Sequence, residues 1–221
     1  MSDPSFLRKR FVILISGQGS NMQKIVESCL ADHCAADVLA VISNRAVSTG
    51  LKWASEKGIA THVVSHTDFS SRNEFDAALS ATIEQYSPDY VLLAGFMRVL
   101  TPEFVQHYAG RLVNIHPSLL PAFPGLHTHA QAIAKGVQAH GCTVHFVTPV
   151  LDHGPIIAQG VVPVMSDDTP ESLAERVLAV EHVVYPQVAI WLARGLVHLM
   201  PDQRVKVDAV HSRIFVSEQS V

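Results

Sequence analysis

The sequence predicts an α/β protein with a single-domain, Rossmann-like, doubly wound mixed sheet. In the first half of the chain, short apolar runs alternate with segments of helical spacing, which is typical of parallel βαβ units. A glycine-rich loop at residues 16–20 joins the first apolar run to the first helical segment. In the second half, two strand-like runs flank a turn rich in Pro and Gly, which predicts an antiparallel hairpin.

Strands and helices are expected to alternate through the first half of the chain. The run 11–15 is wholly apolar, and the segment after the glycine loop places Met22, Ile25 and Cys29 on one helical face. Gly58 is expected to end the second helix. The expected strands are 11–15, 38–42, 61–64 and 90–94, and the expected helices are 21–30, 50–57 and 71–86.

The second half opens with the helix-start signal Thr101-Pro102-Glu103, in which proline takes the first helical position. The elements expected after it are a strand at 112–116, a structured loop at 117–127, strands at 140–148 and 156–164, and a long helix at 169–193 that Gly195 ends. We expect one domain with a phosphate-binding lobe at about 11–100, a catalytic lobe at about 101–200 and a polar tail at 201–221.

The composition indicates an ordinary globular protein. The chain has 221 residues, of which 48% are hydrophobic and 16% are charged, and its net charge is −4. This mild acidity argues against nucleic acid as a partner, because binding to phosphate backbones needs an excess of Lys and Arg. The three cysteines make neither a disulfide framework nor a zinc-binding pair. The apolar runs are too short for a signal peptide or a membrane span, so we expect a cytoplasmic protein without membrane contact.

The loop Gly17-Gln18-Gly19-Ser20-Asn21 is the first candidate site. Backbone amides at the start of a helix, together with the helix dipole, bind anions. A dinucleotide-binding loop would carry a third glycine where Met22 stands and an acidic residue after the second strand, where the chain reads Ser-Asn-Arg. The loop therefore predicts a phosphate site and not a nicotinamide site. The alternative is a tight turn in which Ser20 caps the helix.

Asn114 and His116 are the second candidate site. Residues two apart on a strand project to the same side, and Pro117 ends this strand where an α/β sheet places its ligands. An amide can donate to a developing oxyanion, and an imidazole can carry a proton. Asp152 lies in a turn that could fold back and orient this imidazole. The alternatives are a satisfied polar pair at a strand end and, for Asp152, simple turn chemistry.

Several other polar residues have an ordinary interpretation beside a functional one. His127, His129, His140, His145 and His153 could suggest a metal, but no ligand spacing supports one, so a site without metal is expected. Arg98 follows a strand, where it could meet a carboxylate or phosphate or simply be exposed. Arg72 and the pair Glu181-His182 are expected on helix surfaces.

Six motifs occur in the chain in the same order as in one known family. They are Ile-Ser-Gly-Gln-Gly-Ser-Asn at 15–21, Leu-Ala-Gly-Phe-Met-Arg at 93–98, Asn-Ile-His-Pro-Ser-Leu-Leu-Pro at 114–121, Pro-Gly-Leu-His-Thr-His at 124–129, His-Gly-Cys-Thr-Val-His-Phe-Val at 140–147 and Glu-His-Val-Val-Tyr-Pro at 181–186. Together they resemble the glycinamide ribonucleotide formyltransferases, a family of folate-dependent enzymes of purine synthesis. The resemblance covers about residues 11–199.

The resemblance implies an activity and a role for each motif. It implies transfer of a formyl group from the cosubstrate 10-formyltetrahydrofolate to the amine of glycinamide ribonucleotide. Asn114 and protonated His116 would stabilise the oxyanion, and Asp152 would support His116 and proton transfer through a bound water. The residues implied to bind the ribotide are Gly19, Ser20 and Asn21 at the phosphate and Glu181 at the ribose or glycinamide end. The residues implied on the folate side are Arg72, Met97, Arg98, Val99, Leu100, Val147 and Asp152.

The chain departs from the family pattern at two positions. Gln18 stands where the family commonly has Asn, and His153 replaces a Gly beside Asp152. Three rivals remain: a formyltetrahydrofolate deformylase, a methionyl-tRNA formyltransferase and a catalytically silent binding module. About ten residues precede the first strand, so we expect no N-terminal regulatory domain of the deformylase type. The length and charge argue against an added RNA-binding domain, and we expect a monomer or a homodimer.

Overall fold

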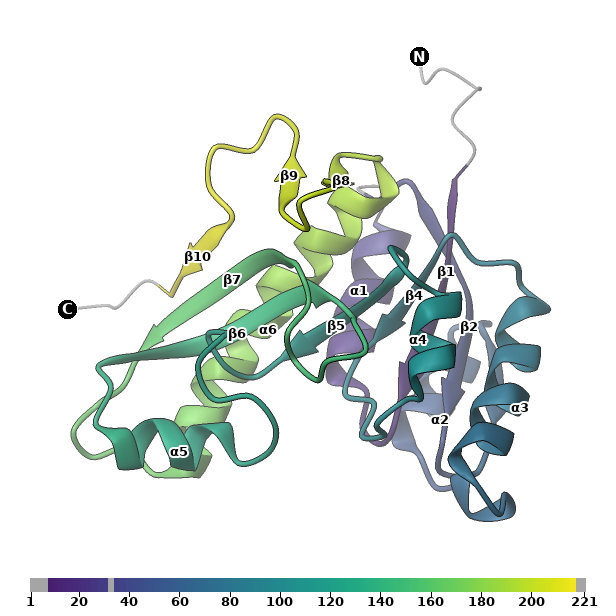
Figure 1. Cartoon of the computed structure of the whole chain (residues 1–221), viewed down its shortest axis with the longest axis horizontal. Helices are drawn as coiled ribbons and strands as arrows, with labels where there is room; N and C mark the ends of the chain where they lie inside the picture. Colours follow the sequence, from purple (N-terminus) through teal and green to yellow (C-terminus); the bar gives the residue numbers. More distant parts are fainter. Residues whose placement is uncertain (1–7, 32–33, 218–221) are drawn as a thin grey trace.

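An eight-stranded sheet organises the molecule, whose computed structural model describes residues 8–31 and 34–217. The strands lie in the order β10-β7-β6-β5-β4-β1-β2-β3 (Figure 1). Their bounds are β1 Lys9–Ile15, β2 Ala36–Ser43, β3 Ala60–Val63, β4 Tyr90–Leu93, β5 Leu112–His116, β6 Ala139–Phe146, β7 Ile156–Pro163 and β10 Ile214–Val216. The helices are α1 Ser20–Leu30, α2 Thr49–Glu56, α3 Arg72–Glu84, α4 Pro102–His107, α5 Thr128–Lys135 and α6 Pro170–Ala193, with a 3₁₀ turn at His66–Asp68.

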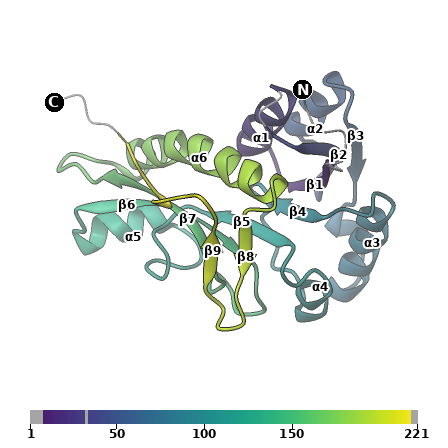
Figure 2. The ribbon, with the colours of Figure 1, turned by 90° about the horizontal axis from the view of Figure 1, so that it is seen from above.

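The first five strands are parallel, and the central strands β1, β4 and β5 are largely buried, whereas β3 at the sheet edge is partly exposed. β1 pairs with β2 on one side and with β4 on the other, and β4 pairs with β5. Alternate residues of β1 enter two separate cores: Phe11 and Ile13 pack on one side, and Val12 and Leu14 on the other. Helices α1 and α6 cover the first side, and α3 and α4 cover the second (Figure 2). This layering confirms the predicted doubly wound sheet.

Side-chain caps fix where most of the predicted helices begin. Ser48, Ser71 and Thr101 each accept a hydrogen bond from a backbone amide in the first turn of α2, α3 and α4. Thr169 and Ser172 form a reciprocal capping box at the start of α6. Proline follows the cap in α4 and α6, as the sequence predicted.

The sheet changes direction at β5. β6 runs antiparallel to β5, and β7 runs antiparallel to β6, which confirms the predicted hairpin. The two hairpin strands approach closely at two glycines: a Cβ on Gly141 would lie 1.8 Å from the carbonyl oxygen of Gly160. A register shift between Val144 and His145 then bends β6 beside the candidate site.

One expectation about the second half is wrong, and one helix was not expected. The polar tail expected from Pro201 onward contains two strands: β9 Val205–Val207 forms an antiparallel ribbon with β8 Val197–Leu199, which precedes the tail, and β10 joins the edge of the main sheet beside β7. Val205 and Val207 are buried, because the ribbon presses their side chains onto the main core. The sequence analysis also missed α5, whose Ala132 is buried in the same core.

None of the described helices is long and apolar enough to cross a membrane.

Candidate active site

The loop between β1 and α1 has the backbone shape of an anion site. Gly19 occupies the N-cap position with a left-handed φ of 68° and makes no side-chain capping bond, so Ser20 is not the cap. The loop is held from α2, because the carbonyl of Gly17 accepts hydrogen bonds from Gly50 N at 3.2 Å and Ser48 Oγ at 2.8 Å. A Cβ on Gly50 would lie 2.6 Å from Ile15 Cδ1, so this close approach needs glycine.

A hollow of about 320 Å³ opens over this loop at the carboxyl ends of β1 and β4. It brings together five residues to which the resemblance assigns a binding role, Gly19, Ser20, Asn21, Met97 and Glu181. The full lining is Ser16, Gly17, Gln18, Gly19, Ser20, Asn21, Arg45, Ala94, Gly95, Met97, Leu178 and Glu181. Arg45, the single Lys or Arg in this lining, was missed as a site residue, although its place just after β2 was a usable signal.

Glu181 is a buried carboxyl group at the back of this hollow. It is 7% exposed, so the surface pair expected from the sequence is wrong at this residue. Asn21 Nδ2 donates to Glu181 Oε2 at 2.7 Å. Burial raises the pKa of Glu181 to about 7, and the hydrogen bond from Asn21 opposes that rise. Asn21 Oδ1 is buried and has no partner among the described residues, so it is open to a donor.

Asn114 and His116 lie on one face of β5, as the sequence predicted. Across the antiparallel pair, Asn114 is opposite His145 and His116 is opposite Thr143. The two faces of this region have different partners, because Tyr185 of α6 donates to the carbonyls of Leu93 and Val113 from the other side. The polar face therefore lies at the strand ends, away from α6.

His116 is enclosed by oxygen acceptors. Its Nδ1 lies 3.5 Å from Asp152 Oδ2, and its Nε2 lies 3.1 Å from the carbonyl oxygen of Phe123. The loop after β6 thus folds back to His116 as expected, and Gly125 N donates to Asp152 Oδ2 at 2.8 Å to hold it there. Each ring nitrogen therefore faces an oxygen acceptor, which fixes the orientation of the His116 ring.

Asn114 has a second neighbour that the sequence analysis did not pair with it. Its Nδ2 lies 3.3 Å from His145 Nε2, and His145 Nδ1 lies 2.9 Å from the carbonyl oxygen of Phe146. His145 had been noted only among the histidines considered for a metal. The pairing depends on the register between β5 and β6, which sequence spacing alone does not give.

The residues predicted on the folate side differ in exposure. Met97 is 62% exposed, and Val99 is also exposed. Leu100 and Val147 are half-buried against the core that faces α3 and α4. The guanidinium of Arg98 lies over the ring of Phe75, and its Nε is buried without a partner among the described residues. Arg72 is exposed at the first position of α3 and lies outside the hollow over the glycine loop.

A buried polar network ties Met97 to the glycine loop. Ser16 Oγ donates to Asn44 Oδ1 at 2.6 Å and accepts from Met97 N at 2.8 Å. His66 Nδ1 lies 3.2 Å from Asn44 Nδ2. This network was not predicted from the sequence, although Ser16 and Asn44 both directly follow apolar strands.

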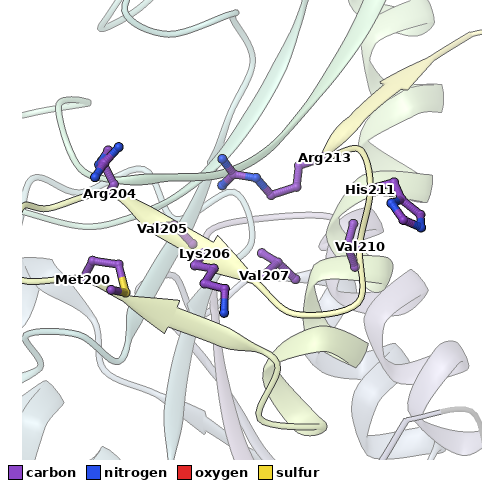
Figure 3. A pocket seen from close by; sticks show the side chains of 8 residues that line it. All are labelled: Met200, Arg204, Val205, Lys206, Val207, Val210, His211 and Arg213. Carbon is purple, nitrogen blue, oxygen red and sulfur yellow. The ribbon is translucent and has the colours of Figure 1, made fainter.

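A second hollow, of about 420 Å³, lies over the ribbon β8–β9 and residues 210–213 (Figure 3). Its lining contains none of the predicted site residues. Its cations already have partners: Arg204 pairs with Asp202, Lys206 pairs with Asp208, and Arg213 donates to the carbonyls of Ile156 and Ile157. The glycine-loop hollow, with a single cation and a buried carboxyl group, is therefore the better candidate.

The described residues contain no cluster of three His, Cys, Asp or Glu side chains arranged to hold a metal ion.

The fold and the site together define a class of enzyme. A glycine loop at the start of a helix and an Asn–His–Asp group both lie at the carboxyl edge of a doubly wound sheet, and such groups can bind a phosphorylated substrate and stabilise charge on an acyl oxygen. Residues 9–189 match the formyl transferase family. The chain belongs to this family and is a formyltransferase.

Relatives of known structure or function share most of the chain. Phosphoribosylglycinamide formyltransferase of Escherichia coli K12 is 52% identical over 184 residues, which cover 83% of this chain and 87% of the relative. The phosphoribosylglycinamide formyltransferase of Coxiella burnetii superposes with a TM-score of 0.88 at 44% identity, covering 94% of this chain and 99% of that one. A formyltetrahydrofolate deformylase from Burkholderia mallei superposes with a TM-score of 0.81 at 28% identity, covering 90% of this chain and 70% of that one.

Proposed function

We propose that the protein transfers the formyl group of 10-formyltetrahydrofolate to the amine of glycinamide ribonucleotide, giving formylglycinamide ribonucleotide and tetrahydrofolate in de novo purine synthesis. One observation carries this proposal: His116 lies between two oxygen acceptors and beside Asn114, at the strand edge that also holds the glycine loop. Relatives named phosphoribosylglycinamide formyltransferase support the substrate, because they match nearly the whole sheet.

The ribotide binds at the glycine loop. The free amides at the start of α1 and the hydroxyl of Ser20 hold the phosphate, and the guanidinium of Arg45 balances its charge. Asn21 and Glu181 meet the ribose or the glycinamide end, where the unpartnered Asn21 Oδ1 accepts a hydrogen bond. A Glu181 with its pKa near 7 can donate or accept a hydrogen bond at neutral pH.

The folate binds against the exposed side chains of Met97 and Val99. These side chains cover its ring faces, and Leu100 and Val147 form the floor beneath them. The residues fit a flat, polar-edged ring, because Arg98 keeps a buried donor without a protein partner beside this floor. Exposed Arg72 at the start of α3 meets the carboxylates of the glutamate tail.

Charge stabilisation is the main contribution of the side chains to the reaction. As the substrate amine attacks the formyl carbon, negative charge develops on the formyl oxygen. Asn114 donates a hydrogen bond to this oxygen, and the positive charge of the nearby His116 ring stabilises it. Asp152, with Oδ2 3.5 Å from His116 Nδ1, orients this ring and places a negative charge beside it. A water held near Asp152 carries the proton from the attacking amine to the departing folate nitrogen. Holding both substrates face to face supplies much of the remaining rate.

The test is a formyl-transfer assay with 10-formyltetrahydrofolate, run with and without glycinamide ribonucleotide, in which both products are identified by mass spectrometry. We expect formylglycinamide ribonucleotide and tetrahydrofolate in equal amounts, only when the acceptor is present. Release of formate without acceptor would instead identify a deformylase. Binding of both ligands without any product would identify a binding module and refute the proposal.

A further inference from the structure

The amide of Asn114 faces a buried imidazole across the β5–β6 pair. Asn114 and His145 are directly opposite in the register, and Asn114 Nδ2 lies 3.3 Å from His145 Nε2. His145 is 2% exposed, so its ring is shielded from solvent. Opposite residues of an antiparallel pair have Cβ atoms close enough for such contacts. The interaction is therefore built into the sheet and does not depend on a loop.

The other ring nitrogen of His145 fixes its tautomer. Nδ1 lies 2.9 Å from the carbonyl oxygen of Phe146, which can only accept a hydrogen bond, so Nδ1 must carry a proton. Burial lowers the pKa of His145, which favours the neutral ring. A neutral ring with its proton on Nδ1 has a lone pair on Nε2. His145 therefore presents an acceptor to Asn114.

Backbone packing holds the Phe146 carbonyl in the position that this tautomer requires. The register shift between Val144 and His145 bends β6 at this point, and Phe146 N donates to the carbonyl of Pro155 at 2.9 Å. Gly154 packs directly on the carbonyl: a Cβ there would lie 1.7 Å from Phe146 O and 3.3 Å from His145 Nδ1. Glycine at position 154 thus allows the turn to pack against the hydrogen bond between His145 Nδ1 and the Phe146 carbonyl.

We propose that His145 is a positioning residue that sets the orientation of the Asn114 amide, so that an N–H and not the carbonyl oxygen faces the formyl oxygen. The inference rests on the proposed function of Asn114 as the oxyanion donor. An acceptor at His145 Nε2 takes one N–H of the amide and leaves the second for the substrate. The flipped amide would set two acceptors against each other and would place its oxygen beside the developing negative charge.

Two substitutions at His145 test this role. His145→Gln can place a carbonyl oxygen where Nε2 lies, whereas His145→Phe keeps a ring without an acceptor. We expect His145→Phe to lower kcat about tenfold to a hundredfold while KM for each substrate changes less than about threefold, because only the oxyanion donor is affected. His145→Gln should recover kcat to within about fivefold of the wild type. A loss of equal size in both variants, or one confined to KM, would overturn the proposal.

A double-mutant cycle separates positioning from general damage to the fold. In an Asn114→Ala background, His145→Phe should change kcat less than about threefold, because there is no amide left to orient. The same loss in both backgrounds would mean that His145 acts independently of Asn114 and would contradict the inference. Thermal denaturation of each variant confirms that the compared proteins are folded.

Nitrogen-15 NMR of the histidine rings tests the tautomer without any turnover. The wild-type protein should show His145 as a neutral ring protonated on Nδ1, and Asn114→Ala should leave that proton in place. Protonation on Nε2 would overturn the inference. Because this measurement needs no substrate, it distinguishes the two ideas: absence of formyl transfer refutes the proposed function, and the wrong tautomer refutes the role of His145.

Discussion

The two regions of the candidate site differ in what forms them: backbone geometry in one and side chains in the other. The glycine loop at the end of β1 relies on backbone geometry, with a left-handed Gly19 and a close contact at Gly50. The facing strands β5 and β6 rely on side chains, which meet in cross-strand pairs such as Asn114 with His145. Parallel strands end in helix N-termini with free amides, whereas antiparallel strands set side chains opposite each other. Binding should therefore be sensitive to loop geometry, and turnover to side-chain identity.

Replacing Asn114 should have the largest effect on turnover. Asn114→Ala removes the amide that we propose donates to the formyl oxygen, and loss of one oxyanion donor typically lowers kcat about 10²–10³-fold. Steady-state kinetics with both substrates near saturation measures the change. A kcat within about threefold of the wild type would show that this amide does not stabilise the transition state.

Glu181→Gln should change how stability depends on pH. The pKa of Glu181 is raised from 4.5 to about 7, so between these values the folded protein holds a proton that the unfolded chain has released. Stability therefore falls as pH rises through this window, by on the order of 3 kcal/mol. Glutamine keeps the hydrogen bond from Asn21 but cannot ionise, so the fall in melting temperature between pH 5 and pH 8 should be several degrees smaller. Identical slopes for both proteins would contradict the raised pKa.

Asp152→Asn should lower turnover less than Asn114→Ala. The substitution suits the backbone, because Asn tolerates the left-handed φ of 50° at this position and can still accept from Gly125 N. It removes the negative charge beside His116 Nδ1, and we expect kcat to fall about tenfold to a hundredfold. Full activity in the variant would mean that the interaction with the Phe123 carbonyl is sufficient to keep the His116 ring in its functional orientation.

Gly19→Ala should weaken ribotide binding with little change in kcat. A side chain at this left-handed residue strains the backbone, and the added Cβ would lie 3.0 Å from Met22 Cε, so we expect the loop to change its shape. We expect KM for glycinamide ribonucleotide to rise about tenfold, which corresponds to about 1.4 kcal/mol. Gly110→Ala is the matched control, because Gly110 has a similar φ of 74° and no atom within 4 Å of its added Cβ. An equal rise in KM for both variants would assign the effect to stability.

Arg45→Ala should give the smallest effect. Arg45 is exposed at the edge of the hollow, and exposed charge interactions contribute up to about 1 kcal/mol. We expect KM for the ribotide to rise about twofold to fivefold, and the difference from wild type to shrink in high salt. Lys52→Ala on α2, with a side chain 81% exposed, removes a charge outside the lining and should leave KM unchanged. Equal effects of both substitutions would indicate only long-range attraction.

The sequence predicted most of the sheet because its strands are locally distinct. The run 11–15 is wholly apolar and leads into the glycine loop, and the strand 112–116 ends before Pro117. The period of two along β5 places Asn114 and His116 on the same side. The ribbon β8–β9 and strand β10 were not predictable in this way, because each has three residues and depends on pairing with distant segments. Local pattern does not carry that information.

The same limit applies to the site. The glycine loop and the Asn–His pair could be found from spacing, whereas the burial of Glu181 depends on how α6 packs against α1. His145 became part of the site only through the register of β5 and β6. Arg45 enters the hollow because β2 lies beside β1, a neighbourhood set by the order of strands in the sheet.

The central claim is that the glycine loop determines ribotide affinity and that the side chains of β5 and β6 determine turnover. Measuring both quantities on the same two variants tests this claim most directly. Isothermal titration calorimetry with glycinamide ribonucleotide should give Asn114→Ala a Kd within about threefold of the wild type, although its kcat falls about 10²–10³-fold. Gly19→Ala should show the reverse pattern, with a Kd about tenfold weaker and a kcat within about threefold. Parallel losses of affinity and turnover in both variants would contradict the account.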